Sequence, residues 1–185
     1  VEEIIKEWGD PTDTRKEKDR NFKPIFFWSS VYVYDAGKTR NWNVPKTMAD
    51  FFDLEAFPGK RGMRKSPKVT LEFALIGDGV PTDQVYDVLR TEEGIARAFA
   101  KLDTIKDQVV WWEAGAQPAQ LLADGEVVFT TAWNGRIFDA VASDGQTFEM
   151  VWDGQVYDID LWIIPKGSKN KATDVNKFQL QQALY

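Results

Sequence analysis

The chain contains no cysteine and no histidine among its 185 residues. The missing cysteines exclude disulfide bonds, thiolate chemistry and cysteine-based metal sites. The missing histidines remove the side chain that proteins use most often as a general base and as a metal ligand. Any catalysis would therefore rest on carboxylates, lysine, tyrosine or serine alone.

Motifs for nucleotides and for activated nucleophiles are missing as well. The sequence has no GxGxxG after a strand-like segment, no GxxxxGK[ST] phosphate loop and no GxSxG. The paired acids Asp158 and Asp160 could act in acid–base catalysis or hold a hard cation, but they equally suit a solvated strand end. The sequence therefore predicts a protein that is not an enzyme and that needs no cofactor and no metal.

Positive charge is scarcer than negative charge, and no long apolar run is present. With 23 Lys and Arg against 29 Asp and Glu, the net charge is −6. An acidic chain argues against nucleic acid as a partner and is compatible with a cationic ligand. No stretch approaches the length of a membrane span, and the opening VEEIIKEWGD is too charged for a signal peptide. If the parent protein is exported, we expect its signal to lie outside this chain.

Aromatic residues, by contrast, are abundant. They make up 14% of the chain and include eight tryptophans. Packing is the commoner use of each ring, but so many rings exceed what a core usually needs. We therefore expect some of them to line a binding surface.

Strand-like and helix-like segments alternate along the chain. Runs rich in β-branched and aromatic residues predict strands at 24–35, from 63, and at 109–112, 126–133, 147–152 and 156–165. Apolar periodicity and capping residues predict helices near the first residues and at 48–53, 67–76, 82–90, 91–106, 118–125, 134–142 and 172–185. This alternation predicts an α/β fold, in which a mainly parallel sheet of about five strands is covered by helices on both faces. Within 91–106, an apolar stripe is expected on one helix face, formed by Ile95, Phe99, Leu102 and Ile105.

Four blocks of sequence carry a resemblance to a known family. They are TMADFFDLEAFPGKRGMRK (47–65), LEFALIGDGVPTDQVYDVL (71–89), VVWWEAGAQPAQLLADGEVVFTTAWNGR (109–136) and WDGQVYDIDLWIIPKGSKNK (152–171). In these blocks and in their order, the chain resembles bacterial extracellular solute-binding proteins of the spermidine/putrescine type. The resemblance implies a two-lobed, hinged receptor of the type II periplasmic binding protein fold, which holds a solute in the cleft between its α/β lobes.

The resemblance also implies an organisation and partners. Residues 25–171 correspond to the second lobe with its hinge strands, whereas 1–24 form a divergent N-terminal helix and linker and 172–185 a C-terminal helix. The implied location is periplasmic or extracellular, the implied ligand is a small, cationic, polyamine-like solute, and the implied partner is an ABC permease. The alternative is an isolated α/β lobe that binds little ligand and self-associates, for instance as a homodimer through its exposed cleft face.

Two residues match the ligand-binding positions of the resembled family. Such receptors hold ammonium groups with carboxylates and pack the methylenes between aromatic rings. Trp133, in TAWNG, falls where the family has a cleft tryptophan, and Asp160, in DIDLW, falls where it has an amine-binding carboxylate. The alternatives are core packing for Trp133 and a solvated or capping acid for Asp160.

Four more residues are candidates for ligand contact. Asp158 lies two positions before Asp160, so both side chains point to one face of a strand. Glu113 and Gln117 lie in the turn that follows the strand at 109–112, and Trp28 lies on a presumed hinge strand. Alternation favours core positions for the other tryptophans of the strands, which are Trp111, Trp112, Trp152 and Trp162.

One segment departs from the resembled family. Residues 65–69 are KSPKV, where polyamine-specific relatives tend to carry acidic residues. The basic segment weakens the prediction of spermidine or putrescine and leaves a differently charged solute open.

Overall fold

A computed structural model describes residues 22–40 and 43–163. The helices predicted near the first residues and at 172–185 lie outside these described residues. The chain divides into two compact units, of which the larger comprises Trp28–Asp158. The two hydrophobic cores of the described chain belong to this larger unit.

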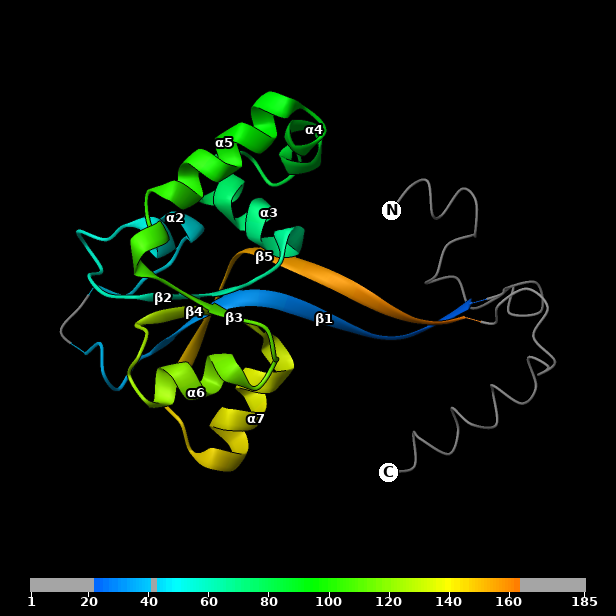
Figure 1. Cartoon of the computed structure of the whole chain (residues 1–185). Coiled ribbons are helices and arrows are strands. Elements are labelled where there is room, and N and C mark those ends of the chain that lie inside the picture. The colour runs from blue at the N-terminus through cyan, green and yellow to red at the C-terminus, as the bar shows by residue number, and fades with distance from the viewer. Residues whose placement is uncertain (1–21, 41–42, 164–185) are drawn as a thin grey trace. The chain divides into compact units, whose positions relative to one another are not determined.

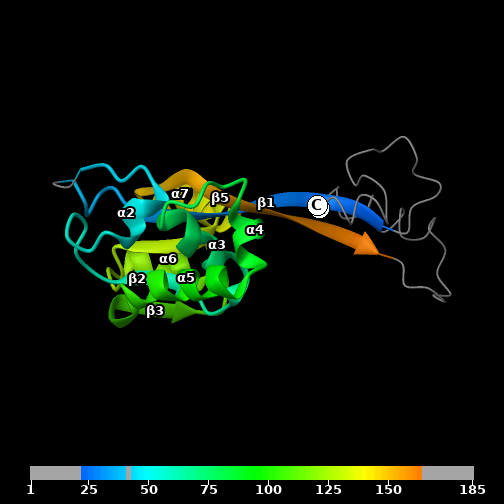
Figure 2. The same cartoon turned by 90° about the horizontal axis from the view of Figure 1, so that it is seen from above.

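The strands of the described chain form one sheet in the order β3-β2-β4-β1-β5 (Figure 1). They are β1 (Phe22–Asp35), β2 (Arg61–Arg64), β3 (Val109–Trp112), β4 (Phe129–Trp133) and β5 (Phe148–Ile163). Strand β2 pairs in parallel with β3 and β4, whereas β1 pairs antiparallel with β4. Within the larger unit, β3 forms one edge of the sheet (Figure 2). The α/β prediction is confirmed, and the sheet is mixed because β1 runs against its neighbour β4.

Helices cover both faces of the sheet (Figure 1). They are α2 (Met48–Phe52), α3 (Pro67–Gly77), α4 (Val85–Leu89), α5 (Glu92–Asp103), η2 (Lys106–Gln108), α6 (Gln117–Ala123) and α7 (Asn134–Asp144). On the face covered by α2 to α5, Tyr32 packs in one buried cluster, and on the face of α6 and α7, Val31 packs in another. Alternate side chains of β1 thus enter two separate cores. No helix of the described part is long and apolar enough to cross a membrane.

The two strands predicted at 147–152 and 156–165 form one strand, β5. The physical reason is Gly154, whose φ of 66° lies in the left-handed region that glycine adopts without a Cβ penalty. A Cβ at this position would also lie 2.8 Å from Cγ2 of Ile76, so the contact with α3 requires a glycine. The glycine therefore accommodates a local bend within the strand and does not end it.

Helix α5 buries a different face from the one its apolar stripe predicts. Ile95 and Phe99 are 40% and 55% exposed, whereas the buried positions of α5 are Gly94 and Ala98. A Cβ on Gly94 would lie 1.9 Å from the carbonyl oxygen of Val88, so α5 approaches the end of α4 too closely for a large side chain. The prediction was wrong for Ile95 and Phe99, and two large apolar side chains remain on the surface.

A fully buried arginine ties α2 to the start of β2. Arg61 donates hydrogen bonds to the carbonyl oxygens of Phe51 at 2.8 Å, Asp53 at 2.9 Å and Gly59 at 2.6 Å. Its guanidinium carbon lies 4.9 Å from the ring centroid of Phe129. Burial lowers the pKa of Arg61 to about 10. The carbonyl partners offset the cost of removing this charge from water.

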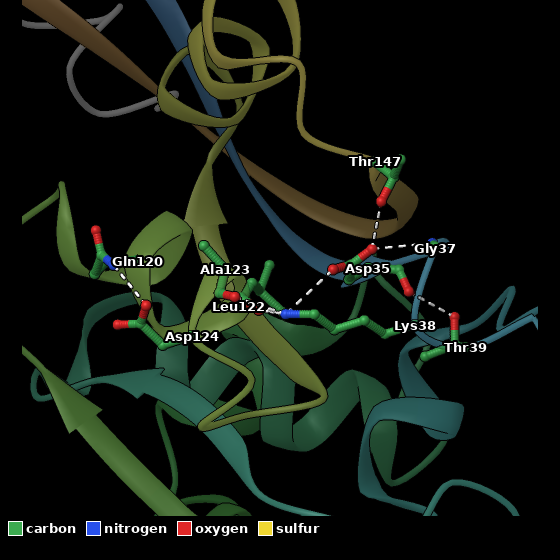
Figure 3. Close-up of polar contacts among 9 residues, drawn as sticks. All are labelled: Asp35, Gly37, Lys38, Thr39, Gln120, Leu122, Ala123, Asp124 and Thr147. Atoms are coloured by element: carbon green, nitrogen blue, oxygen red, sulfur yellow. Dashed lines mark hydrogen bonds and ion pairs between the residues drawn. The ribbon is translucent and has the colours of Figure 1, made fainter.

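A second polar cluster joins the end of β1 to helix α6 (Figure 3). Lys38 donates from Nζ to the carbonyl oxygens of Leu122 and Ala123, each at 2.7 Å. These carbonyls belong to the last turn of α6, and that of Leu122 also accepts the N–H of Gly125 at 3.0 Å. Asp35 accepts a hydrogen bond of 2.5 Å from the hydroxyl of Thr147, just before β5. The cluster thus fixes α6 and the start of β5 to the end of β1 that is remote from Trp28.

Candidate ligand-binding site

Three parallel strands end at the same edge of the sheet. Strand β2 ends at Arg64, β3 at Trp112 and β4 at Trp133. Ligands of open α/β sheets bind outside the carboxyl ends of such strands. Antiparallel β1 brings Trp28 to the same edge, because Ser30 pairs with Trp133. We name this edge, with Trp28, Arg64, Glu113 and Trp133, the strand-end site.

Trp133 lies at the centre of the strand-end site. Its ring contacts Trp28 edge-on with 5.3 Å between centroids, and Trp112 edge-on with 5.9 Å between centroids. Trp112 is buried, whereas Trp28 and Trp133 are partly exposed. Such edge-to-face contacts are favourable arrangements for aromatic pairs. The buried ring of Trp112 therefore supports two rings that solvent or a ligand can reach.

Gly115 holds the loop after β3 against the ring of Trp133. A Cβ at residue 115 would lie 2.2 Å from Cζ3 of Trp133 and 2.7 Å from Cε3. No real Cβ approaches a carbon so closely, so any larger residue would displace the indole or the loop. The glycine thus determines the position of the Trp133 ring.

Arg64 places a positive charge against the same ring. Its guanidinium carbon lies 5.2 Å from the ring centroid of Trp133, within the range of a cation–π contact. Within residues 22–40 and 43–163, no carboxylate lies within ion-pair distance of Arg64. A guanidinium has five N–H donors in a planar fork that matches a carboxylate. Arg64 is therefore suited to bind an external carboxylate beside Trp133.

Glu113 and Gln117, two of the predicted ligand contacts, have partners of their own. Glu113 lies 3.4 Å from Nζ of Lys65, in a pair whose side chains are 73% and 67% exposed. Oε1 of Gln117 accepts hydrogen bonds from the N–H groups of Glu113 at 2.8 Å and Ala114 at 2.7 Å. The carbonyl of Gln117 thus holds the turn after β3, whereas the carboxylate of Glu113 remains accessible to solvent.

Asp158 forms an ion pair with Lys68. Lys68 follows Pro67 at the start of α3, and its backbone is non-helical. The next residue, Val69, has a φ of 73°, which a β-branched residue adopts only under strain. Asp158 is 30% exposed, so the pair lies at the surface of the larger unit.

The pKa of Tyr86 reflects its burial and the negative charges of Glu72 and Asp158 near its phenol. Burial raises the pKa of Tyr86, and the charges of Glu72 and Asp158 and a hydrogen bond with Glu72 raise it further. Glu72 is buried. The surroundings of Asp158 thus combine two carboxylates with a protonated phenol, and Lys68 supplies the opposite charge.

The sixth candidate, Asp160, lies on β5 beyond the boundary of the larger unit, and it is partly buried. It has interaction partners of its own. Its place on one surface with Trp133 stays a prediction, as does its role in binding an amine. The larger unit brings together Trp28, Glu113, Gln117 and Trp133, and holds Asp158 in a separate pair with Lys68.

Arg64 is the site residue that the sequence reasoning missed. Its signal was its position, since Arg64 lies in the strand predicted from residue 63 and directly before the basic segment 65–69. The expectation for the remaining tryptophans holds for Trp112, which is buried, but was wrong for Trp111 and Trp152, which are 46% and 47% exposed. Trp111 lies on the edge strand β3, where only one neighbouring strand shields it. The side chain of Trp162 lies outside the described residues.

Comparison with known families identifies the chain. Residues 22–179 match the family described as bacterial extracellular solute-binding protein. The chain belongs to this family. As predicted, its members are solute-binding proteins and not enzymes, and the family description agrees with the predicted location outside the cytoplasm.

Individual relatives indicate which members of the family the chain resembles. The chain is 50% identical over 147 residues to the gamma-aminobutyric acid-binding protein of Pseudomonas aeruginosa, covering 80% of this chain and 41% of that protein. Among solved structures, the PBP MotA from A. tumefaciens B6 in complex with glucopine is 33% identical with a TM-score of 0.77, covering 92% of this chain and 54% of that one. The Atu4243–GABA receptor is 36% identical with a TM-score of 0.74, covering 87% of this chain and 48% of that one.

The polyamine part of the resemblance is not confirmed. The spermidine/putrescine-binding protein PotD of Streptococcus pneumoniae shares 12% identity with the chain at a TM-score of 0.65, so it shows the fold alone. The chain spans about half the length of its relatives.

Proposed function

We propose that the chain is a ligand-binding lobe of an extracytoplasmic receptor for a small ω-amino acid of the γ-aminobutyrate kind, which passes its ligand to an ABC permease. The identity of 50% with a gamma-aminobutyric acid-binding protein supports the class of ligand. The observation in the site that carries the proposal is the guanidinium of Arg64 over the ring of Trp133. A ligand of this class has a carboxylate at one end and an ammonium at the other, so it needs partners of both signs.

The carboxylate end fits Arg64. A guanidinium binds a carboxylate through two parallel hydrogen bonds, and the neighbouring ring limits its hydration. A polyamine has no group that could use this guanidinium, and two like charges close together repel. The charge of Arg64 therefore favours a ligand with a carboxylate over a purely cationic one.

The ammonium end fits the aromatic and acidic groups predicted from the sequence. The faces of Trp28 and Trp133 attract a desolvated ammonium, and Glu113 offers an accessible carboxylate. Asp158, in the larger unit, is a further anionic partner in this proposal, and Asp160 keeps the amine-binding role that the family resemblance implies. In the described state Lys68 already pairs with Asp158, so a ligand ammonium competes with a lysine there.

The polyamine ligand and the self-associating lobe remain the alternatives. Both use the same strand ends, the first through carboxylates alone and the second through contacts between two copies. Their chemistry differs from that of the ω-amino acid in one respect, since neither needs the guanidinium of Arg64 to meet a small carboxylate.

Four ligands with the same four-carbon chain test the proposal. They are γ-aminobutyrate, butyrate, butylamine and putrescine, titrated into protein labelled with 5-fluorotryptophan and followed by fluorine NMR. The signal of Trp133 is assigned by its loss in Trp133→Phe. We expect the largest affinity for γ-aminobutyrate, weaker binding of butyrate, and the weakest binding of the two amines.

Putrescine binding at least as tight as γ-aminobutyrate would favour the polyamine alternative. A Trp133 signal that no ligand shifts, together with a concentration-dependent sedimentation coefficient, would favour self-association. Equal affinity for butyrate and γ-aminobutyrate would show that the ammonium contributes nothing to binding. The chain would then be a receptor for carboxylates and not for ω-amino acids.

A further inference from the structure

A cavity is lined by residues of α3, α5 and β3 and of the connection between β2 and α3. Its volume is about 360 Å³, which lies within the usual range for small-molecule pockets. Its lining includes Lys65, Ser66, Leu71, Phe99, Leu102 and Trp111. Consecutive side chains of a strand point to opposite faces, so Trp111 and Trp112 of β3 serve separate surfaces. We name the cavity the α3–α5 pocket.

The walls of the α3–α5 pocket are apolar side chains that the fold leaves uncovered. Phe99 is 55% exposed and Trp111 is 46% exposed, although both rings would gain from burial. Phe99 belongs to the stripe of α5 that the sequence places in a core and the structure places on the surface. Exposed apolar surface of this kind on a folded domain marks a contact site.

The polar lining of the pocket is cationic and lacks an acid. Lys65 and Ser66 come from the short connection between β2 and α3, and no Asp or Glu lines the cavity. Ser66 is the N-cap residue of α3, yet its side chain makes no capping hydrogen bond. The polar side of the pocket therefore offers an ammonium and a hydroxyl to an incoming acceptor.

The ammonium of Lys65 already pairs with one carboxylate, that of Glu113. Its carboxylate lies 3.4 Å from Nζ of Lys65, and both side chains are more than two-thirds exposed. An exposed pair of this kind is weak and readily exchanged. A carboxylate presented from inside the pocket can therefore replace that of Glu113.

From these observations we propose that the α3–α5 pocket binds an amphipathic carboxylate, with an aryl or alkyl body against Phe99, Leu102 and Trp111 and the carboxylate on Lys65. The pocket adjoins the strand-end site through the pair of Lys65 and Glu113, and the proposal does not rest on the proposed function. One positive side chain and the absence of acids in the lining select an anion over a cation or a neutral molecule.

The probe for the test is 4-phenylbutyrate, with the uncharged 4-phenylbutyramide as its matched control. Fluorine NMR of protein labelled with 5-fluorotryptophan follows the signal of Trp111, assigned through Trp111→Phe. We expect the acid to shift the Trp111 signal at lower concentrations than it shifts the Trp133 signal, and the amide to bind several-fold more weakly.

Two pairs of variants locate the binding. Lys65→Gln should weaken the acid by about two- to fivefold, the factor an exposed ion pair carries, whereas Lys106→Gln, also an exposed lysine in an ion pair, should not. Phe99→Ala should weaken it by about tenfold, whereas Phe138→Ala, an equally exposed phenylalanine on α7, should not. Glu113→Gln should strengthen the acid, because it removes the competing carboxylate.

Three results would overturn the proposal. The first is no shift of Trp111 at roughly 10 mM acid, a concentration at which even millimolar sites are filled. The second is binding that survives Phe99→Ala and is lost in Trp133→Ala, which would assign it to the strand-end site. The third is self-association that Phe99→Ala abolishes, which would make a second copy the occupant.

Discussion

The guanidinium of Arg64 lies over the indole of Trp133, with 5.2 Å between Cζ and the ring centroid. The two residues end neighbouring parallel strands, so the contact is fixed by the sheet and not by a loop. The ring shields one side of the cation from water, which strengthens the cation's interaction with a carboxylate. This pair is the feature of the strand-end site on which ligand selection depends in our proposal.

Arg64→Gln should remove the preference for a carboxylate. We expect at least about a fivefold loss in the affinity for γ-aminobutyrate, and no loss for butylamine, because only the former uses the guanidinium. Arg64→Lys should restore part of the affinity, since a lysine keeps the charge and loses the planar fork. Arg90→Gln, at an exposed arginine directly after α4, is the control that should bind like the parent chain. A loss of the same size for butylamine would show that Arg64 only supports the fold.

Gly115→Ala should move the ring of Trp133. The new Cβ would lie 2.2 Å from the ring, so we expect a change in near-ultraviolet circular dichroism, a loss of ligand binding and a destabilisation of about 1–3 kcal/mol. Gly135→Ala, at the start of α7, is the matched control because nothing lies within 4 Å of its added Cβ. Alanine favours the helix there, so its stability should stay the same or rise. Equal behaviour of the two variants in thermal unfolding would contradict the close approach at Gly115.

Lys68→Gln should make the chain bind cationic ligands better. Lys68 pairs with Asp158, so its removal takes away one cation that competes with a ligand ammonium for this carboxylate, and we expect the affinity for putrescine to rise by about two- to fivefold. Asp158→Asn in the same background should cancel the gain. The measurement is a fluorine NMR titration of the double-mutant cycle at two salt concentrations, and the gain should shrink at the higher one. An unchanged affinity for putrescine in Lys68→Gln would place Asp158 outside the ligand's reach.

Tyr32 should make the stability fall at alkaline pH. Its hydroxyl donates to the carbonyl oxygen of Thr47 at 2.8 Å, and burial, with a smaller contribution from Asp50, raises its pKa far above 10. In the unfolded chain the phenol ionises above pH 10, whereas in the folded chain it keeps its proton. The stabilisation is therefore present below pH 10 and is lost as the pH rises above it. Urea unfolding of Tyr32→Phe should show about 1 kcal/mol less stability at pH 7 and a shallower decline between pH 10 and 11. A decline as steep as that of the parent would assign the effect to other groups.

Most of the fold could be predicted from the sequence because its elements have local signals. Thr47 and Asp50 mark the start of α2, and Asp50 does accept the N–H of Thr47. The local signal at Gly154 is ambiguous, since a glycine between two strand-like runs suits a turn between two strands as well as a bend within one strand. The choice depends on the contact of Gly154 with Ile76, which is far away in the sequence. The buried face of α5 could not be predicted for a similar reason. The close packing of Gly94 on Val88 is a tertiary contact, which the local sequence does not indicate.

The position of the candidate site at the strand ends could be predicted from the sequence. The positive charge that Arg64 brings to this site could not. Trp133 follows a clear strand, so its place at the strand ends follows from the alternation alone. Its contact with Arg64 does not, because β3 and several helices lie between β2 and β4 in the chain, so their pairing has no local signal. The basic segment 65–69 was interpreted as a departure from a polyamine site. In three dimensions Arg64, directly before that segment, supplies the cation of the proposed carboxylate site.

The affinity of this chain for its ligand should be low. A two-lobed receptor closes around its solute and removes water from both sides. In our proposal, this chain supplies only one wall of the ligand-binding cleft. An exposed ion pair contributes about 0–1 kcal/mol and an exposed cation–π contact about 0.5–1 kcal/mol. Micromolar binding requires roughly 8 kcal/mol, so we expect dissociation constants on the order of millimolar for γ-aminobutyrate and weaker ones for putrescine. Calorimetric titration with sedimentation analysis of the same sample measures both affinity and oligomeric state. Submicromolar binding by a monomer would show that one wall suffices, and tight binding by a dimer would show that a second copy supplies the other.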